Sequence, residues 1–177
     1  MNSLSRTIIF ITLMLSILAT SSCATLTDDI VVETHANSDV NYHAYKTYAW
    51  AGSAQIIFDP IGQWEQPTLD TDEEVKFVIN RELRARGLHQ VTNHPDLLIA
   101  FAAGIDTSIL ELKDNPDNDK KIVTNVPKAA LLIALVDANT GYTVWVGYAV
   151  GDAQQQQTIE TIRARIDYAV KEIFSDY

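Results

Sequence analysis

The sequence contains two apolar segments of strand length, Ala129-Ala-Leu-Leu-Ile-Ala-Leu-Val136 and Tyr142-Thr-Val-Trp-Val-Gly-Tyr-Ala-Val150, joined by the polar connection Asp137-Ala-Asn-Thr-Gly141. β-Branched and aromatic residues favour extended backbone, and a short polar connection that ends in glycine is typical of a hairpin turn. This stretch therefore predicts a β-hairpin around which the other elements pack. Gly147 lies inside its second strand, which indicates a bulge or the close approach of another backbone.

Three segments upstream also have the composition of strands: Ile30-Val-Val-Glu-Thr-His35, Lys46-Thr-Tyr-Ala-Trp50 and Pro95-Asp-Leu-Leu-Ile-Ala-Phe-Ala103. The first two are expected to be neighbours in the sheet, and the nearly continuous apolar third suits a central strand. Two glycines and two prolines predict an irregular, apolar loop over residues 51–69. The Asp- and Asn-rich residues 113–121 predict an exposed loop.

Two amphipathic helices are expected. Thr71-Asp-Glu-Glu74 has the spacing of a capping box, and Gly87 suits the position after a helix. Between them, apolar residues recur on one helical face at Val75, Val78, Ile79 and Leu83. A last helix has an apolar face of Ile159, Ile162, Ile166, Val170, Ile173 and Phe174. The order β-β-α-β-β-β-α predicts an α+β two-layer sandwich, with both helices on one face of a largely antiparallel sheet of five or six strands.

Length and charge limit the organisation and the partners. The chain has 177 residues, of which 47% are hydrophobic, so residues 30–177 are expected to form a single domain. Its formal net charge is -10. A protein of this sign gains nothing from counterion release on DNA or RNA, and no large Lys/Arg cluster offsets it, so no nucleic-acid partner is expected.

The amino-terminal residues have the layout of a signal peptide: Arg6, then an apolar run from Ile8 to Ala19, then the small residues Thr20, Ser21 and Ser22. The dense apolar part is shorter than the roughly 20 residues that a membrane-spanning helix needs. The only cysteine, Cys23, follows directly. This position resembles the lipobox of bacterial lipoproteins, in which the cysteine is acylated and becomes the first residue of the mature chain.

Residues 1–22 are therefore expected to be a signal peptide, and residues 23–29 a lipidated tether that joins the protein to a membrane. Ala24 stands where aspartate favours retention in the inner membrane of Gram-negative bacteria, so the resemblance implies the periplasmic face of the outer membrane. The alternative is ordinary cleavage near Ala19-Thr-Ser21, which leaves a soluble periplasmic domain with an incidental cysteine.

Several segments, in order, resemble the bacterial lipoprotein family known as domain of unknown function 4136. After the leader that ends in Cys23, they are Tyr45-Lys-Thr-Tyr-Ala-Trp50, Ile79-Asn-Arg-Glu-Leu-Arg-Ala-Arg-Gly87, Pro95-Asp-Leu-Leu-Ile99, Leu135-Val-Asp-Ala-Asn-Thr-Gly141 and Val144-Trp-Val-Gly147. The resemblance implies an envelope address and an α+β fold. It implies no activity.

No arrangement of residues in the sequence indicates catalysis, a cofactor or a metal. The histidines His35, His43, His89 and His94 have no ligand-like spacing. Asn115, Asp117 and Asp119 imitate the start of an EF-hand, but Lys120 and Val126 replace its glycine and its bidentate glutamate. We therefore expect a protein that is not an enzyme; a hydrolase would require two of the histidines to converge with a carboxylate.

Phe58, Ile61 and Trp64 make the loop after Trp50 too apolar for a passive linker. They are interpreted as a contact surface, or alternatively as a lid on the core. The leading functional hypothesis is an outer-membrane-anchored interaction or envelope-maintenance module with an unknown envelope protein as its partner. The alternative is a small-ligand or lipid-binding accessory component of an envelope transport system, which requires an apolar pocket of roughly 300 Å³ or more.

Overall fold

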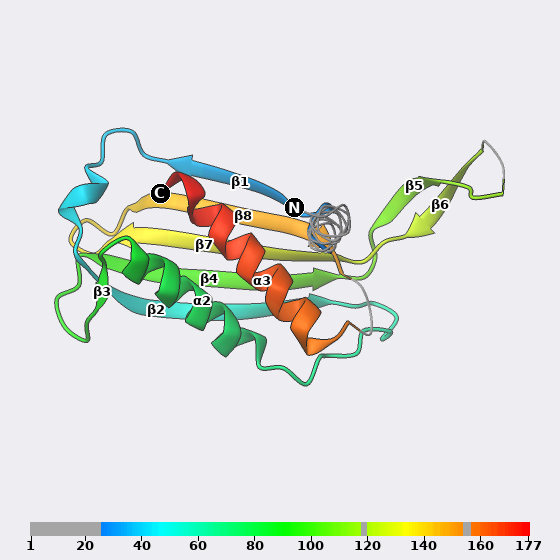
Figure 1. Ribbon diagram of the computed structural model, residues 1–177, viewed down its shortest axis with the longest axis horizontal. Helices are drawn as coiled ribbons and strands as arrows, with labels where there is room; N and C mark the ends of the chain where they lie inside the picture. Colours follow the sequence, from blue (N-terminus) through cyan, green and yellow to red (C-terminus); the bar gives the residue numbers. More distant parts are fainter. Residues whose placement is uncertain (1–25, 118–119, 154–156) are drawn as a thin grey trace, which may run out of the picture.

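The computed structural model describes residues 26–117, 120–153 and 157–177. Six strands form one sheet in the order β1-β8-β7-β4-β2-β3, and two long helices cover one of its faces (Figure 1). In chain order the elements are β1 (Val31–Ala36), the 3-10 helix η2 (Tyr42–Ala44), β2 (Thr47–Phe58), α2 (Thr71–Ala85), β3 (His89–Gln90), β4 (Leu97–Asp106), β5 (Leu110–Asp114), β6 (Lys121–Asn125), β7 (Lys128–Asp137), β8 (Thr143–Asp152), α3 (Ile159–Ile173) and η3 (Phe174–Asp176). The predicted α+β two-layer sandwich is confirmed.

The predicted hairpin of β7 and β8 lies in the middle of the sheet. β7 pairs antiparallel with β8 on one side and with β4 on the other, and β4 pairs in parallel with β2. The parallel pair is possible because α2 carries the chain from the end of β2 back to the start of β4. The described part of the chain contains no helix long and apolar enough to cross a membrane.

The expected pairing of the first two strands is wrong. β1 pairs antiparallel with β8, from Val31 opposite Val150 to Ala36 opposite Trp145, and so lies at one edge of the sheet, far from β2. The connection crosses the end of the sheet and is held there, because the Tyr42 hydroxyl donates to the carbonyl of Val144 at 2.6 Å.

The loop predicted for residues 51–69 is wrong in its first half. β2 continues to Phe58, paired with β4 as far as Asp106, and passes Gly52 through a shift in register after Trp50. Glycine marks a bulge here and does not end the strand. The irregular connection begins only at Asp59.

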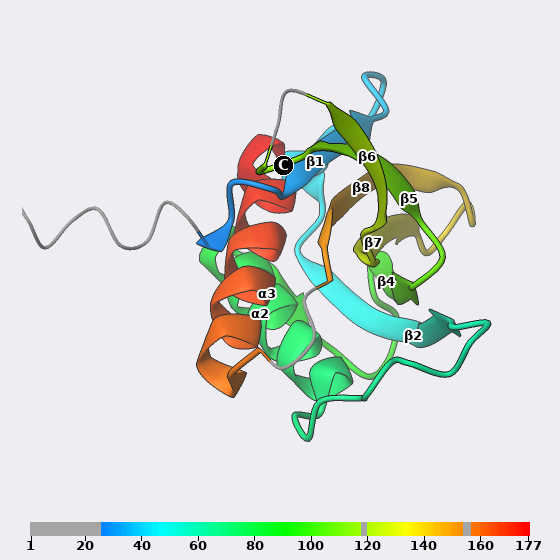
Figure 2. The same cartoon turned by 90° about the vertical axis from the view of Figure 1, so that its right-hand side faces the viewer.

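The exposed loop predicted for residues 113–121 is wrong at its two ends. These ends belong to β5 and β6, which pair antiparallel from Leu110 opposite Asn125 to Asp114 opposite Lys121. The hairpin, called the arm below, projects beyond the end of the main sheet (Figures 1 and 2).

The two helices begin and end at identifiable caps. Asp70 is the N-cap of α2, and its carboxylate accepts from the backbone N–H of Glu73 at 3.1 Å, so the cap lies one residue before the predicted Thr71. Gly87 follows the helix with φ of 84°, as predicted. Thr158 caps α3 in the same manner as Asp70 caps α2, by accepting from the N–H of Thr161.

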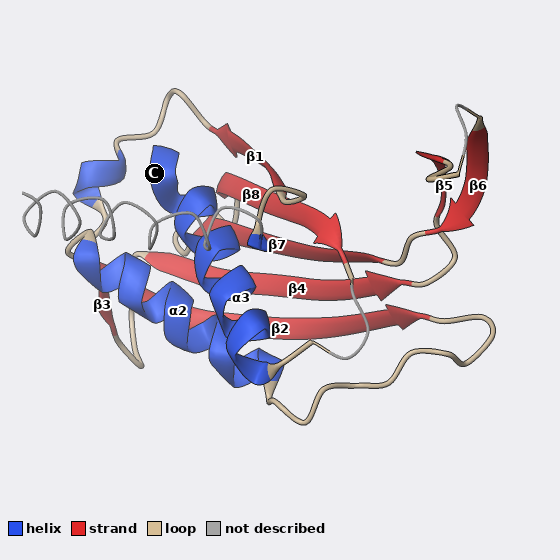
Figure 3. Cartoon of the chain, turned by 45° about the vertical axis from the view of Figure 1, so that its right-hand side comes forward, coloured by secondary structure: helices blue, strands red, loops and turns tan. Residues whose placement is uncertain are grey.

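The core lies between the sheet and the two helices, as predicted (Figure 3). Its fully buried members include Ile79 and Leu83 from α2, Val170 and Ile173 from α3, and Trp145 from β8. A Cβ on Gly147 would stand 2.8 Å from the side chains of both Ile173 and Trp145. Side chains, and not the backbone that was expected, therefore make the close approach that requires glycine there.

A candidate ligand-binding cavity between sheet and helices

A cavity of about 680 Å³ lies between the sheet and the helices, at the end of the sheet from which the arm projects. Its floor is formed by residues of the sheet: Gln55, Ile57, Ala103, Ile105, Leu131 and Ala149. Its roof comes from the first turns of α2 and the first three turns of α3: Val75, Ile162, Ile166 and Ala169. The segment from Trp64 to Thr71 forms one side wall.

The cavity exists because side chains on the helix-facing side of the sheet become smaller toward this end. Near β3 the layer between sheet and helices is filled by Tyr48, Phe101 and Trp145. Toward the arm the corresponding positions on β4 and β8 hold Ala103 and Ala149. Ala169 of α3 also lines this region, so small residues from three elements leave space that large residues fill elsewhere.

Arg165 of α3 lines the other side of the cavity and forms an ion pair with Asp29, which precedes β1. The two terminal nitrogens of Arg165 each lie 2.7 Å from a carboxylate oxygen of Asp29, and they also donate to the carbonyls of Leu26 and Asp152. The Asp152 N–H donates to the same carboxylate at 2.6 Å. The hydrogen bond from Arg165 holds the pKa of Asp29 below its ordinary value.

Gly151 makes room for this ion pair. A Cβ at that position would stand 2.9 Å from Nη2 of Arg165 and 3.0 Å from the Asp29 carboxylate. Glycine therefore lets the pair sit directly on β8.

The lining of the cavity has few charges, and most of them are negative. Its ionisable residues are Arg165, Glu65, Asp70 and Asp152. Because both terminal nitrogens of Arg165 are already engaged by Asp29 and by carbonyls, they offer little to a ligand anion. The cavity therefore suits an uncharged apolar molecule better than a carboxylate or a phosphate.

The structure separates the three residues predicted as a contact surface. Trp64 is half-buried and lines the cavity, and its backbone N–H donates to the Asp59 carboxylate at 2.8 Å. Phe58, the last residue of β2, and Ile61 are 55% and 73% exposed and do not line the cavity. Cys23 and Ala24 lie outside the described residues; the described chain begins at Leu26, against Arg165.

The four histidines are exposed and lie on separate segments. Within residues 26–117, 120–153 and 157–177, no group of three or more His, Cys, Asp and Glu side chains is placed to hold a metal ion. Asp96, which the sequence puts near His94, accepts hydrogen bonds from Lys46 and Thr47 at 2.8 to 2.9 Å. It ties β2 to the start of β4.

The aromatic residues around the second strand belong to the core. Tyr48 is buried, and Tyr42, Tyr45 and Trp50 pack against the core cluster. Tyr45 donates to the Asp137 carboxylate at 2.8 Å, and its pKa is raised to about 12, mainly by burial. These residues close the end of the core opposite the cavity.

Residues 32–177 match the family model described as a domain of unknown function, DUF4136, and no curated protein matches the chain. A solved DUF4136 family protein from Bacteroides thetaiotaomicron is 16% identical, with a TM-score of 0.53 over 83% of this chain and 95% of that one. The PelC dodecamer from Paraburkholderia phytofirmans is 11% identical over 82% and 96% of the two chains, with a TM-score of 0.49. A minor lipoprotein from Acinetobacter baumannii is 14% identical over 74% and 91%, with a TM-score of 0.38. The family match spans most of the sequence, so the chain belongs to the DUF4136 family.

Proposed function

We propose that this protein is a lipid-anchored periplasmic protein of the bacterial outer membrane that holds an uncharged apolar ligand, such as one acyl chain, between its sheet and its helices. The cavity of about 680 Å³ carries the proposal. Ligand sites in proteins are commonly about 300 to 1,000 Å³ in volume and mostly apolar. The lipid-binding alternative from the sequence is therefore preferred here to a module that only binds other proteins.

The lining supports an acyl chain as the ligand. Ile57, Ile105, Leu131, Ile162 and Ile166 come from both layers and present branched aliphatic side chains. Transfer of each methylene from water to such surroundings is favourable by about 0.8 kcal/mol, so a chain of ten carbons gains several kcal/mol. The paired Arg165 and the surrounding carboxylates favour a neutral head group over an anionic one.

The position of Leu26 supports a membrane address at the cavity end. Leu26 is held by Arg165, and Cys23 precedes it by three residues. Three residues span at most about 11 Å when fully extended. An acyl group on Cys23 would thus bring the cavity end of the domain close to a bilayer, which is where apolar ligands are dissolved.

Binding is tested with the mature chain carrying Cys23→Ser and exported through a leader that does not require lipidation. A fluorescent monoacylglycerol is the neutral probe, and the fatty acid with the same chain is its anionic counterpart. We expect saturable binding of the neutral probe with one site per chain, and weaker binding of the fatty acid. Absence of saturable binding of either probe would overturn the proposed ligand.

Two variants locate the bound probe. Ile162→Trp fills part of the cavity and is expected to weaken binding at least tenfold. Phe77→Trp is the matched control, because Phe77 is exposed on α2 and does not line the cavity. Equal binding by both variants would place the ligand elsewhere.

A further inference from the structure

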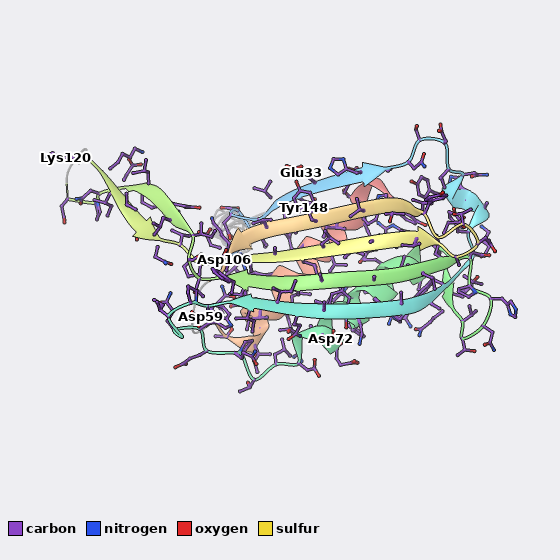
Figure 4. All side chains as sticks on the ribbon, turned by 180° about the vertical axis from the view of Figure 1, so that it is seen from behind. Glu33, Asp59, Asp72, Asp106, Lys120 and Tyr148 are labelled. Atoms are coloured by element: carbon purple, nitrogen blue, oxygen red, sulfur yellow. The ribbon has the colours of Figure 1, made fainter. Side chains whose placement is uncertain are left out.

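The face of the main sheet that points away from the helices carries no other described element, and it is largely apolar, with Glu33, Tyr148 and Asp106 among its polar residues (Figure 4). One row crosses five strands by direct register partners: Ile56, Gly104, Ala130, Val150 and Val31. Ile56 and Val31, at the two ends of the row, are each 61% exposed. The small residues between them leave the middle of the row open to another chain.

The arm has an apolar face of its own. Leu110, Leu112 and Val123 share one face of the hairpin and are 65%, 66% and 65% exposed, and Leu112 and Val123 are direct partners. The ion pair of Asp114 and Lys121 lies at the tip of the same face, and Asn125 at its base. Glu111 lies on the opposite face and is held by Lys128 at 2.5 Å and Lys113 at 2.9 Å. The polar face of the arm is thus fastened to the body, while its apolar face is left to solvent.

Hydrogen bonds hold the base of the arm to the end of the main sheet. Thr107 is buried, and its hydroxyl donates to Asp59 at 2.8 Å. The Asn125 side chain donates to the Thr107 carbonyl at 2.7 Å, and the Val126 N–H donates to the Ile109 carbonyl at 2.9 Å. The arm extends beyond the end of the main sheet, and its apolar side chains are exposed there (Figures 1 and 4).

From these surfaces we infer that the protein associates with itself, the apolar face of one arm packing on the apolar row of the next copy. A single chain supplies both halves: a narrow ribbon with three exposed apolar side chains, and a row across the sheet with Gly104 and Ala130 near its centre. Residues 110–125 hold three lysines against four acidic residues, so the arm adds little to the repulsion between copies of a chain whose net charge is -10.

The two surfaces are different, so the contact is head-to-tail. Such contacts build a ring when the rotation between neighbours closes and a filament when it does not. The arm projects at the same end of the molecule as the start of β1 (Figure 1), which allows neighbours held by one membrane to meet side by side. Ile56, Gly104 and Ala130 also border the cavity, but the contact needs only their exposed side and no ligand in the cavity.

Disulfide trapping in intact cells tests the contact in the full chain. The double variant Leu112→Cys with Ala130→Cys is expected to give a ladder of trimers and larger species on a non-reducing gel. Each single variant sets the background, including any contribution of Cys23. The matched control joins Leu112→Cys to Phe77→Cys, because Phe77 is exposed on α2 on the helical side of the molecule.

A ladder with Ala130→Cys that greatly exceeds the ladder with Phe77→Cys supports the inference; no ladder, or equal ladders, overturns it. Sedimentation of the detergent-solubilised protein gives a second measurement. Leu112→Asp is expected to shift the wild-type oligomer to monomer and to leave the unfolding midpoint unchanged, because Leu112 is outside the core. A wild-type protein that stays monomeric at every concentration also overturns the inference.

Discussion

Arg165 and Asp29 form a bidentate ion pair that joins α3 to the segment before β1, with both N–O distances equal to 2.7 Å. The Arg165 side chain is only 12% exposed, so most of its surface is withdrawn from water. The pair therefore joins the segment before β1 to the last helix at the edge of the cavity.

Asp29→Ala leaves the guanidinium of Arg165 with carbonyl partners only. Removal of a hydrogen-bonded charged partner typically costs about 1.5 to 3 kcal/mol. The free energy of unfolding should fall by that amount, and the urea midpoint should fall with it. Asp28→Ala is the control, because Asp28 is exposed one residue away. Equal midpoints for the two variants would show that the pair contributes nothing to folding.

Acid should weaken the same contact. The pKa of Asp29 is lower in the folded protein than its ordinary value, mainly because of Arg165. A depressed folded pKa gives stability that is present above the unfolded pKa, near 3.9, and that is lost as pH falls through the folded value. The difference in unfolding free energy between wild type and Asp29→Ala should therefore shrink below about pH 4. A difference that stays constant down to pH 2 would contradict this linkage.

High pH should lower the stability of the protein through Tyr177, which lies at the end of the core opposite the Arg165–Asp29 pair. Burial raises the pKa of Tyr177 to about 12, and its hydroxyl has no hydrogen-bond partner among the described residues. Below the unfolded pKa of about 10 the Tyr177 hydroxyl is neutral in both states, and its contribution to the free energy of unfolding is complete. This contribution is lost as the pH rises through the folded pKa of about 12. Tyr177→Phe should keep or raise stability at neutral pH, since it removes an unsatisfied polar atom, and should lose less stability between pH 10 and 12. A large loss at pH 7 would mean that the hydroxyl has a partner after all.

The proposed lipid anchor at Cys23 leads to a separate prediction. Intact-mass analysis should find a mature chain that begins at an acylated Cys23, and the protein should sediment with outer membranes. The prediction depends on the lone cysteine after the apolar run and on Ala24. An unmodified chain that starts near Ser22 and is released by osmotic shock would instead support the soluble alternative.

The sequence predicted the parts of the fold that depend on local pattern. The β7–β8 hairpin and the apolar faces of α2 and α3 follow from residue periodicity within short windows. The pairing of strands is not a local property. Val31 lies opposite Val150, and Ile56 lies opposite Gly104, and composition within a short window does not specify such distant partners. Glycine and proline signals around Gly52 and Pro60 also do not distinguish a bulge inside a strand from the end of that strand.

The cavity was not predictable in the same way. Ala103, Ala149 and Ala169 are each ordinary in their own segments, and only the tertiary arrangement brings them to one end of the core. Small residues at helix-facing positions were the sequence feature that could have indicated a cavity. Whether these residues lie together depends on the register of β4 against β7 and of β7 against β8. Trp64 was identified as important for another reason, as part of an exposed surface.

Trp64→Ala now tests the cavity wall against the two roles expected from the sequence. Trp64 is half-buried and faces the cavity, so its removal enlarges a space that already exists and should cost clearly less than the roughly 3 to 5 kcal/mol of a fully buried tryptophan. Binding of the neutral probe should weaken several-fold, because part of one wall is lost. Ile173→Ala provides the contrast: Ile173 is fully buried away from the cavity, and its truncation should cost about 2 to 5 kcal/mol of stability. If Trp64→Ala destabilised the protein as much as Ile173→Ala, the residue would be a lid on the core, and if it left both stability and probe binding intact, the wall would have no part in the site.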